Sequence, residues 1–103
     1  MCGFVGYGSN NSNQSFSIKN LKNAIESIHY RGPDHTGFWS SKDRNIAVAH
    51  KRLSILDLSD RSNQPFKDKN AKFTIVFNGE IYNYLSLKED LLLLGHSFET
   101  SSD

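Results

Sequence analysis

The one cysteine of the chain, Cys2, directly follows Met1 and is the residue best placed to act as a nucleophile. If Met1 is removed, Cys2 carries both a thiol and a free α-amine. An α-amine has a pKa of about 7.7–8.0, against about 10.4 for a lysine, so it is the more available base at neutral pH. Pairing such an amine with a hydroxyl or thiol nucleophile is a known catalytic arrangement. By position alone, Cys2 is also typical of a small buried apolar residue near the start of a strand.

A second candidate is the dipeptide Asn78-Gly79, which follows the apolar residues 73–77. On its own this dipeptide indicates a tight hairpin turn. A helical pattern follows it instead of a second alternating strand, and this weakens the hairpin interpretation. Glycine also lets the main chain approach a ligand closely, so a binding role for this dipeptide stays open.

The histidine and glycine patterns indicate neither a metal site nor a nucleotide site. The four histidines lack the spacings that are typical of a Cys–His pair or of metal ligands. Gly3, Gly6 and Gly8 precede a polar stretch instead of a helix, so they do not form a dinucleotide-binding fingerprint. No phosphate-binding loop motif is present. We therefore predict no metal and no cofactor in these residues.

Four blocks of sequence stand out by their order and spacing: Met1-Cys2-Gly3-Phe4-Val5-Gly6, Arg31-Gly32-Pro33-Asp34, His50-Lys51-Arg52-Leu53-Ser54-Ile55 and Asn78-Gly79-Glu80-Ile81-Tyr82-Asn83. Together they resemble the class II glutamine amidotransferases, and in particular the glutaminase domain of the asparagine synthetase branch. The resemblance extends over residues 1–103. It lapses only in the polar stretches 9–17 and 59–71, which we interpret as surface loops.

The resemblance implies a glutaminase reaction on L-glutamine. Cys2 would attack the side-chain amide, and its own amine would carry the proton, so that no histidine partner is required. The side-chain amide of Asn78 and the N–H of Gly79 would form the oxyanion hole. Losing one donor of such a hole typically costs about 2.7–4 kcal/mol of transition-state stabilisation.

The resemblance also implies how the other end of glutamine is bound. Arg52 would bind the α-carboxylate with its planar guanidinium, and Asp103 would pair with the α-ammonium near Glu80. Four residues that follow Arg52 would line the pocket: Leu53, Ser54, Ile55 and Leu56. Without the resemblance, single charged residues of this kind are usually just solvated. We interpret the block Arg31-Gly32-Pro33-Asp34 as a structural turn.

Residues 1–103 thus resemble the N-terminal portion of a glutaminase domain, without the synthetase domain of the family. In the family, that C-terminal domain uses ATP, Mg²⁺ and the released ammonia to convert aspartate to asparagine, so we expect ATP and Mg²⁺ to bind there. Two alternatives stay open, a glutaminase module of another amide-forming amidotransferase and a truncated fragment without activity. Because the implied fold needs two complete sheets, we expect the isolated 103 residues to be inactive.

The first half of the chain must place Cys2 and Arg52. Apolar residues alternate with glycine over residues 2–7, which predicts a strand at the N-terminus. Residues 18–29 carry an apolar stripe at helical spacing, formed by Leu21, Ala24, Ile25 and Ile28. Two further strands are predicted over residues 36–40 and 46–50, and the polar residues between them predict a hairpin.

The second half must place Asn78-Gly79 and Asp103. Residues 73–77 predict a buried strand, and residues 84–94 predict a helix with Gly95 as its C′ residue. Another strand is predicted to begin at residues 97–99. Strands mixed with two helices, without regular βαβ alternation, predict the α+β class. The resemblance implies the N-terminal nucleophile hydrolase fold, two stacked antiparallel sheets between helical layers, which is expected to be incomplete here.

The composition is that of an ordinary globular domain. With 103 residues, 37% hydrophobic and 22% charged, the chain has room for one domain. A net charge of +1 with scattered basic residues argues against a nucleic-acid partner. The longest apolar run, residues 91–94, is far too short for a membrane span, and no signal-peptide pattern is present. One cysteine cannot form an internal disulfide, which agrees with a reducing compartment, so we expect a cytoplasmic protein.

Overall fold

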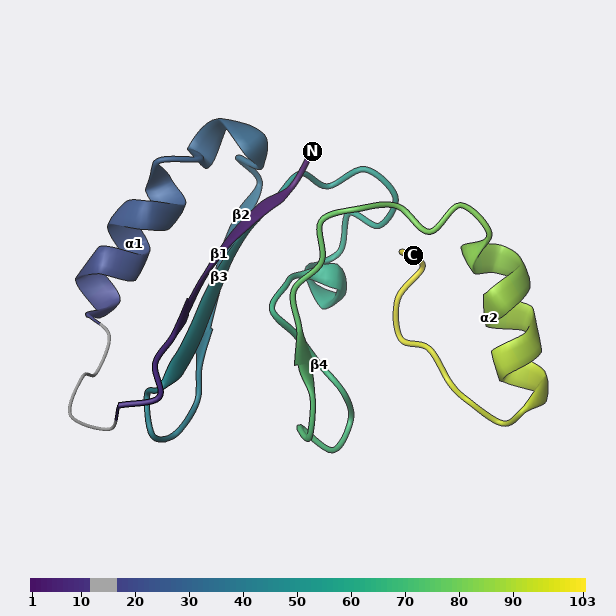
Figure 1. Cartoon of the computed structure of the whole chain (residues 1–103). Helices are drawn as coiled ribbons and strands as arrows, with labels where there is room; N and C mark the ends of the chain where they lie inside the picture. The colour runs from purple at the N-terminus through teal and green to yellow at the C-terminus, as the bar shows by residue number, and fades with distance from the viewer. Residues whose placement is uncertain (12–16) are drawn as a thin grey trace.

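The computed structural model describes residues 1–11 and 17–103. Its elements, in chain order, are β1 (Gly3–Gly8), α1 (Ile18–Glu26), the 3₁₀ helix η1 (His29–Arg31), β2 (His35–Ser40), β3 (Ile46–Arg52), the 3₁₀ helix η2 (Asp60–Ser62), β4 (Phe66–Lys67), β5 (Thr74–Ile75) and α2 (Tyr84–Leu93). Figure 1 shows a sheet covered by α1, a small hairpin in the middle and α2 at the far end. Two antiparallel sheets with two helices confirm the α+β class.

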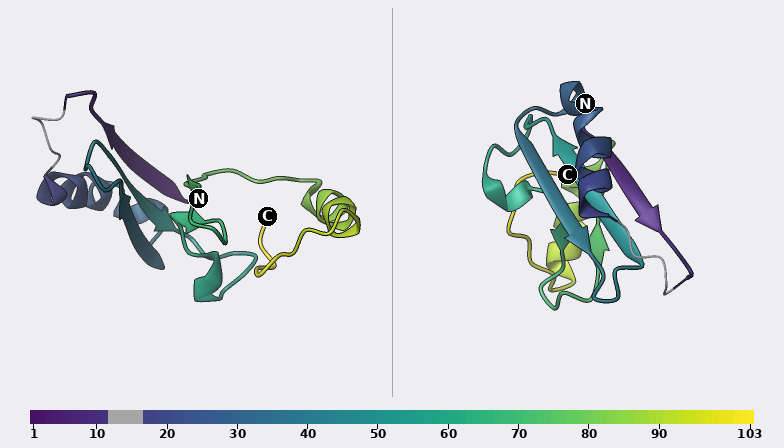
Figure 2. Two further views of the ribbon diagram at one scale, coloured as in Figure 1. Left: turned by 90° about the horizontal axis from the view of Figure 1, so that it is seen from below. Right: turned by 90° about the vertical axis from the view of Figure 1, so that its left-hand side faces the viewer.

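The larger sheet has the strand order β1-β3-β2, with antiparallel neighbours throughout. Gly3 pairs with Lys51 and His35 pairs with Arg52, so the N-terminus lies beside the last residues of the central strand β3. The left view of Figure 2 shows the N-terminus at the junction between this sheet and the hairpin, with the C-terminal segment returning towards it from α2. The two ends of the chain thus approach the same region.

The predicted hairpin between β2 and β3 is confirmed. Its turn is organised by Asp43, whose carboxylate accepts hydrogen bonds from Ser41 Oγ at 2.5 Å and from the N–H of Asn45 at 3.2 Å. These bonds, the one from Ser41 first, hold the pKa of the exposed Asp43 carboxyl below its ordinary value. The turn lies at the end of the sheet that is remote from Cys2.

β3 presents alternate residues to two different surroundings, because successive side chains of a strand point to opposite faces. The face towards α1 forms the core of this half, which consists of Leu21, Ile25, Ala47 and Ala49. Ile25 is fully buried, a contribution of about 1.5–3 kcal/mol from the hydrophobic effect. The opposite face carries His50 and Arg52, which make hydrogen bonds to the segments beyond the sheet.

Helix α1 ends at Glu26, so the prediction that it continues to residue 29 is wrong at its C-terminal end. Ser27 Oγ donates to the carbonyl of Ala24 at 2.7 Å, a local bond that competes with helix continuation. The chain then tightens into η1 before Gly32. Of the predicted stripe, Leu21 and Ile25 are buried, whereas Ala24 is exposed.

β3 continues two residues further than predicted, through Lys51 and Arg52. Although both added residues are charged, each is only 6% exposed. Lys51 Nζ donates to Glu26 of α1 at 2.6 Å, and Arg52 donates to the loop on the other face. Because each charge finds a partner, burial of the two residues is tolerated.

The second half departs most from the predictions. The strand predicted over residues 73–77 is limited to β5, whose one partner among the described residues is β4. Phe73 and Ile75 are 73% and 56% exposed, so the prediction of a buried strand is wrong. Residues 97–99 form no strand; the ring of Phe98 instead packs under Lys88 Nζ of α2 at 5.3 Å. Helix α2 ends one residue early and is followed by Gly95 at φ 88°, which confirms its C′ position.

The interpretation of residues 59–71 as a surface loop is wrong in part, since this stretch contains η2 and β4 and buries Ser62. Its polar side chains bind main-chain and guanidinium groups instead of water: Asn63 accepts from Arg52, and Gln64 accepts from the N–H of Phe77. Residues 12–16 of the other predicted loop, 9–17, lie outside the described residues.

Candidate active site

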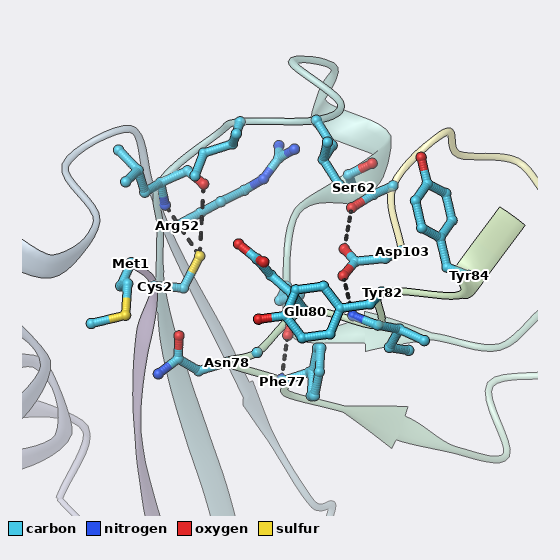
Figure 3. A pocket seen from close by; sticks show the side chains of 17 residues that line it. Met1, Cys2, Arg52, Ser62, Phe77, Asn78, Glu80, Tyr82, Tyr84 and Asp103 are labelled. Atoms are coloured by element: carbon cyan, nitrogen blue, oxygen red, sulfur yellow. Dashed lines mark hydrogen bonds between the residues drawn. The ribbon is translucent and has the colours of Figure 1, made fainter.

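The larger sheet ends at a cavity of about 550 Å³. Its walls come from the N-terminus, from the segment after β3, from residues 77–84 and from the last two residues (Figure 3). Nine of the ten predicted site residues line it: Cys2, Arg52, Leu53, Ile55, Leu56, Asn78, Gly79, Glu80 and Asp103. Ser54 does not, and its main-chain N–H donates to the carboxylate of Asp34 at 2.7 Å.

Cys2 is partly buried, and its sulfur contacts both the N–H and the carbonyl of Leu53. The N–H of Leu53 donates to Sγ at 3.3 Å, and Sγ donates in turn to the Leu53 carbonyl at 3.7 Å. An N–H directed at sulfur is a contact that a thiolate also accepts. Met1 precedes Cys2 and lines the same cavity, so in this form of the chain the nitrogen of Cys2 is an amide and not a base.

The block Arg31-Gly32-Pro33-Asp34 positions Cys2, a role that the sequence analysis missed. Arg31 Nε donates to the carbonyl of Cys2 at 2.9 Å. Gly32 is buried so closely against the end of β3 that an added Cβ would lie 2.6 Å from the carbonyl carbons of Lys51 and Arg52. The block connects η1 to β2 with a bend at Asp34, and its Arg and Asp side chains bind the segments that carry Cys2 and Ser54.

The segment that precedes Asn78-Gly79 is held through both main-chain polar groups of Phe77. The N–H of Phe77 donates to Gln64 Oε1 at 2.5 Å, and the carbonyl of Phe77 lies 3.3 Å from Nε2 of His50. A Cβ added to Gly79 would lie 2.7 Å from the Phe77 ring, so a larger residue would require that ring to move. In Figure 3 the Asn78 side chain lies on the same side of the cavity as Cys2.

His50 is fully buried and was not predicted to contribute to the site. A neutral ring with its proton on Nε2 donates to the Phe77 carbonyl, and Nδ1 has no partner among the described residues. Burial lowers the pKa of His50; the bond to Phe77 opposes this, and the charges of His35 and Arg52 lower the pKa further. The histidine therefore contacts the main chain that leads to Asn78.

Arg52 reaches the cavity from the end of β3 and is held by the loop that follows. Nη1 donates to the Ser59 carbonyl and to Asn63 Oδ1, both at 2.9 Å, and Nη2 donates to the Asp57 carbonyl. These bonds use three of its N–H groups and leave the Nε–H and one N–H of Nη2 without a partner among the described residues. Two N–H groups of a guanidinium are sufficient for a two-point contact with a carboxylate.

The C-terminal segment brings Asp103 to the cavity. Its Oδ2 accepts the N–H of Ile81 at 2.8 Å, and its Oδ1 accepts from Ser102 Oγ at 3.3 Å. Glu80 extends into the same cavity (Figure 3). Two carboxylates in one cavity with Arg52 provide both signs of charge that a zwitterionic amino acid requires.

Two searches of the described residues, 1–11 and 17–103, bear on other kinds of site. No group of three or more His, Cys, Asp or Glu side chains in these ranges could hold a metal ion. Within the same ranges, no helix is long and apolar enough to cross a membrane.

The chain is similar to known glutamine amidotransferases. The family model for a glutamine amidotransferase domain matches residues 1–103. The chain is 38% identical over 108 residues to asparagine synthetase [glutamine-hydrolyzing] 1 of Bacillus subtilis, with 100% of this chain and 16% of that protein covered. A probable asparagine synthetase [glutamine-hydrolyzing] of Dictyostelium discoideum is 34% identical over 104 residues, with 100% and 18% covered.

A third relative carries a different name. Amidase chry2 of Gibberella zeae is 40% identical over 74 residues, which cover 72% of this chain and 11% of that protein. The chain thus spans less than a fifth of the length of these relatives. No solved structure matches it significantly.

Proposed function

Because the chain belongs to the glutamine amidotransferase family, we propose that it hydrolyses the side-chain amide of glutamine and releases ammonia for a second reaction. The observation that carries the proposal is the convergence of Cys2, Asn78-Gly79, Arg52 and Asp103 on one cavity, although they lie up to about a hundred residues apart in sequence. A nucleophile, donors for an oxyanion and both charges for an amino-acid end are the parts that this reaction requires.

The covalent step uses the sulfur of Cys2. The thiolate forms a bond to the amide carbon, and the electron pair of the C=O bond moves to oxygen, where Asn78 and Gly79 donate to it. The α-amine of Cys2 takes up the thiol proton as the thiolate forms and so becomes an ammonium group. The C–N bond then breaks, and nitrogen leaves as ammonia after taking that proton from the ammonium group. Water attacks the resulting γ-glutamyl thioester and releases glutamate and the thiol.

The amino-acid end of glutamine is held by charge. Arg52 binds the α-carboxylate through its two remaining N–H groups, and Asp103 accepts the α-ammonium beside Glu80. The apolar side chains of Leu53, Ile55 and Leu56 line the same cavity, and the main chain of Leu53 also contacts the Cys2 sulfur. Leu53 therefore connects the reacting end of the site to the binding end.

The relatives favour asparagine as the final product. Two of them are named glutamine-hydrolysing asparagine synthetases, and the chain matches each over 100% of its own length. We propose that the ammonia passes to a synthetase domain outside residues 1–103, in which aspartate is activated with ATP and Mg²⁺. The amidase named among the relatives supports a second candidate, an amide-forming enzyme with a different acceptor.

Fold and location are proposed on the same basis. The two antiparallel sheets are compatible with part of an N-terminal nucleophile hydrolase fold, in which the cysteine begins the first strand of the domain. A free thiol used as a nucleophile suits a reducing compartment, so we propose that the protein acts in the cytoplasm.

The test is Cys2→Ala in the full-length protein, with glutamate release and ammonia-driven amide synthesis measured separately. We expect glutamine hydrolysis to be lost and ammonia-driven synthesis to be retained. Cys2→Ser is the matched variant, because it keeps a hydroxyl near Leu53 but replaces the thiolate with a weaker nucleophile, and it should also lose most of the activity. Glutaminase activity that survives Cys2→Ala would contradict the proposal.

A further inference from the structure

Asp57 connects two parts of the cavity that are far apart in sequence. Its side chain is only 7% exposed, and both carboxylate oxygens accept hydrogen bonds. Oδ1 accepts the N–H of Ser59 at 2.8 Å, a contact within the loop. Oδ2 accepts both the N–H and the hydroxyl of Ser101, at 2.9 and 3.1 Å, across 44 residues of sequence.

The main chain of Asp57 contacts the Arg52 side of the cavity. Its carbonyl accepts a hydrogen bond from Nη2 of Arg52. One residue therefore touches the guanidinium with its main chain and the C-terminal segment with its side chain. Asp103 follows Ser101 by two residues, which is too short a distance for the chain to move freely between them.

We propose that Asp57 is a positioning residue that fixes Asp103 relative to Arg52, and that it thereby sets the preference of the site for substrates with an α-ammonium group. The inference rests on the proposed function, in which Arg52 binds the α-carboxylate and Asp103 binds the α-ammonium. Without the bonds to Asp57, the last residues keep the bond from Lys88 Nζ to the Thr100 carbonyl and the bond from the N–H of Ile81 to Asp103, neither of which connects them to the Arg52 side of the cavity.

A role for Asp57 within its own loop would not account for the two hydrogen bonds from Ser101. A turn at the start of η2 needs only the Oδ1 contact to Ser59, whereas Oδ2 is directed at another segment and accepts two donors there. Hydrogen bonds from Ser59 and then from Ser101 hold the pKa of the Asp57 carboxyl far below its ordinary value. The group thus stays a carboxylate, and a strong acceptor, at neutral pH.

The experiment compares two substrates in the full-length protein: L-glutamine, and glutaramate, which has the same amide and carboxylate but no α-ammonium. The measured quantity is the ratio of the two kcat/KM values. Asp103→Asn should lower the ratio by about ten- to a hundredfold, because a charged hydrogen bond is lost. Asp57→Ala should lower it by a similar factor and change kcat at saturating glutamine by less than about threefold.

The double variant tests whether Asp57 acts through Asp103. Asp57→Ala combined with Asp103→Asn should have the same ratio as Asp103→Asn alone, within about twofold, because two changes to one interaction do not add. Asp43→Ala is the matched control: it removes a carboxylate with similar turn contacts at the remote end of the sheet and should leave the ratio unchanged.

Three results would overturn the inference. A folded Asp57→Ala with an unchanged ratio would show that Asp57 does not position Asp103, and additive effects in the double variant would show that it acts elsewhere. An unchanged ratio in Asp103→Asn would instead reject the assignment of Asp103 in the proposed function, and the inference with it. If Asp57→Ala does not fold, Ser101→Ala takes its place, because Ser101 is exposed and the change removes one of the two donors to Asp57 Oδ2. It should lower the ratio about threefold. An unchanged ratio would refute the connection between Asp57 and Asp103.

Discussion

Gly32 is the position at which one methyl group should disturb both Cys2 and Arg52. In Gly32→Ala the added Cβ would lie 2.6 Å from the carbonyl carbons of Lys51 and Arg52, whereas ordinary contacts begin at 3.4 Å. The turn and the end of β3 must therefore separate by about 0.8 Å. The three nearest atoms belong to the main chain of the central strand, so no side-chain rotation can relieve these contacts.

The size of the effect follows from two opposing terms. Overpacking of this kind costs about 1–3 kcal/mol. Replacing glycine reduces the freedom of the unfolded chain and returns about 0.4–1 kcal/mol. We therefore expect Gly32→Ala to lower the free energy of unfolding by about 1–2 kcal/mol.

Activity should fall by more than stability alone accounts for. The same turn carries the bond from Arg31 to the Cys2 carbonyl and the bond from Ser54 to Asp34. A displacement of the order of 1 Å at a reacting group can cost about a hundredfold, so kcat for glutamine hydrolysis should fall by about ten- to a hundredfold.

Gly8→Ala is the matched control, because no atom lies within 4 Å of the added Cβ. It should keep full activity and be equally stable or more stable by up to about 1 kcal/mol. The assays are urea unfolding and steady-state glutaminase kinetics on the full-length protein. If Gly32→Ala unfolded at the same urea concentration as Gly8→Ala and kept its kcat, the turn would not be tightly packed and the reasoning would be refuted.

Three further predictions concern the same cavity. Active enzyme should begin at Cys2 in intact mass spectrometry, because retained Met1 turns the required amine into an amide; uniform retention in active protein would contradict this. In steady-state kinetics, Arg52→Ala should mainly raise KM, whereas Asn78→Ala should mainly lower kcat. If Asn78→Ala changed only KM, the assignment of Asn78 to the oxyanion hole would be rejected. Burial lowers the pKa of His50, so the stability that neutral His50 contributes is complete above the ordinary value of 6.5 and decreases as the pH falls below it. Urea unfolding at about pH 7.5 and about pH 5.5 should therefore show a smaller loss of unfolding free energy in His50→Gln than in the unmodified protein. An equal loss in both proteins would count against this role of His50.

Predictions that depend on local patterns agree best with the structure. The β2–β3 hairpin follows from two alternating stretches with polar residues between them, and Asp43 organises the turn as such residues do. Gly95 adopts the positive φ that a helix C′ position favours, and the N–H of His96 and of Gly95 donate to the carbonyls of Leu91 and Leu92 in the Schellman arrangement. Neighbours within a few residues decide both features.

Predictions failed where distant hydrogen bonds decide the outcome. β3 runs through two charged residues because Glu26 forms an ion pair with Lys51 and the following loop accepts hydrogen bonds from Arg52. Residues 59–71 are polar because their side chains bind Arg52 and Phe77, a use that composition alone cannot distinguish from solvent exposure. Conversely, residues 73–77 are apolar but largely exposed, since no described segment covers them.

For the site, the resemblance found most of the proposed binding residues that line the cavity, but not Ser62, Gln64 and Tyr84, which also line it, nor the residues that hold the site in place. Cys2 meets Leu53 across 51 residues, His50 meets Phe77 across 27, and Asp57 meets Ser101 across 44. Contacts over such separations leave no periodic signal in the sequence. The one available signal was the block Arg31-Gly32-Pro33-Asp34, because a simple turn does not require charged residues at both of its ends.

The alternation of β3 has a consequence for how this domain can change in length. His50 and Arg52 serve the cavity, while Lys51 between them serves α1. Deleting or inserting a single residue within Ile46–Arg52 would exchange the two faces, so that the lysine would enter the cavity and its neighbours would turn to the helix. Insertions and deletions among natural variants are therefore expected in the connections between strands, where the number of residues does not decide which side chains face the cavity. They should be selected against inside β3.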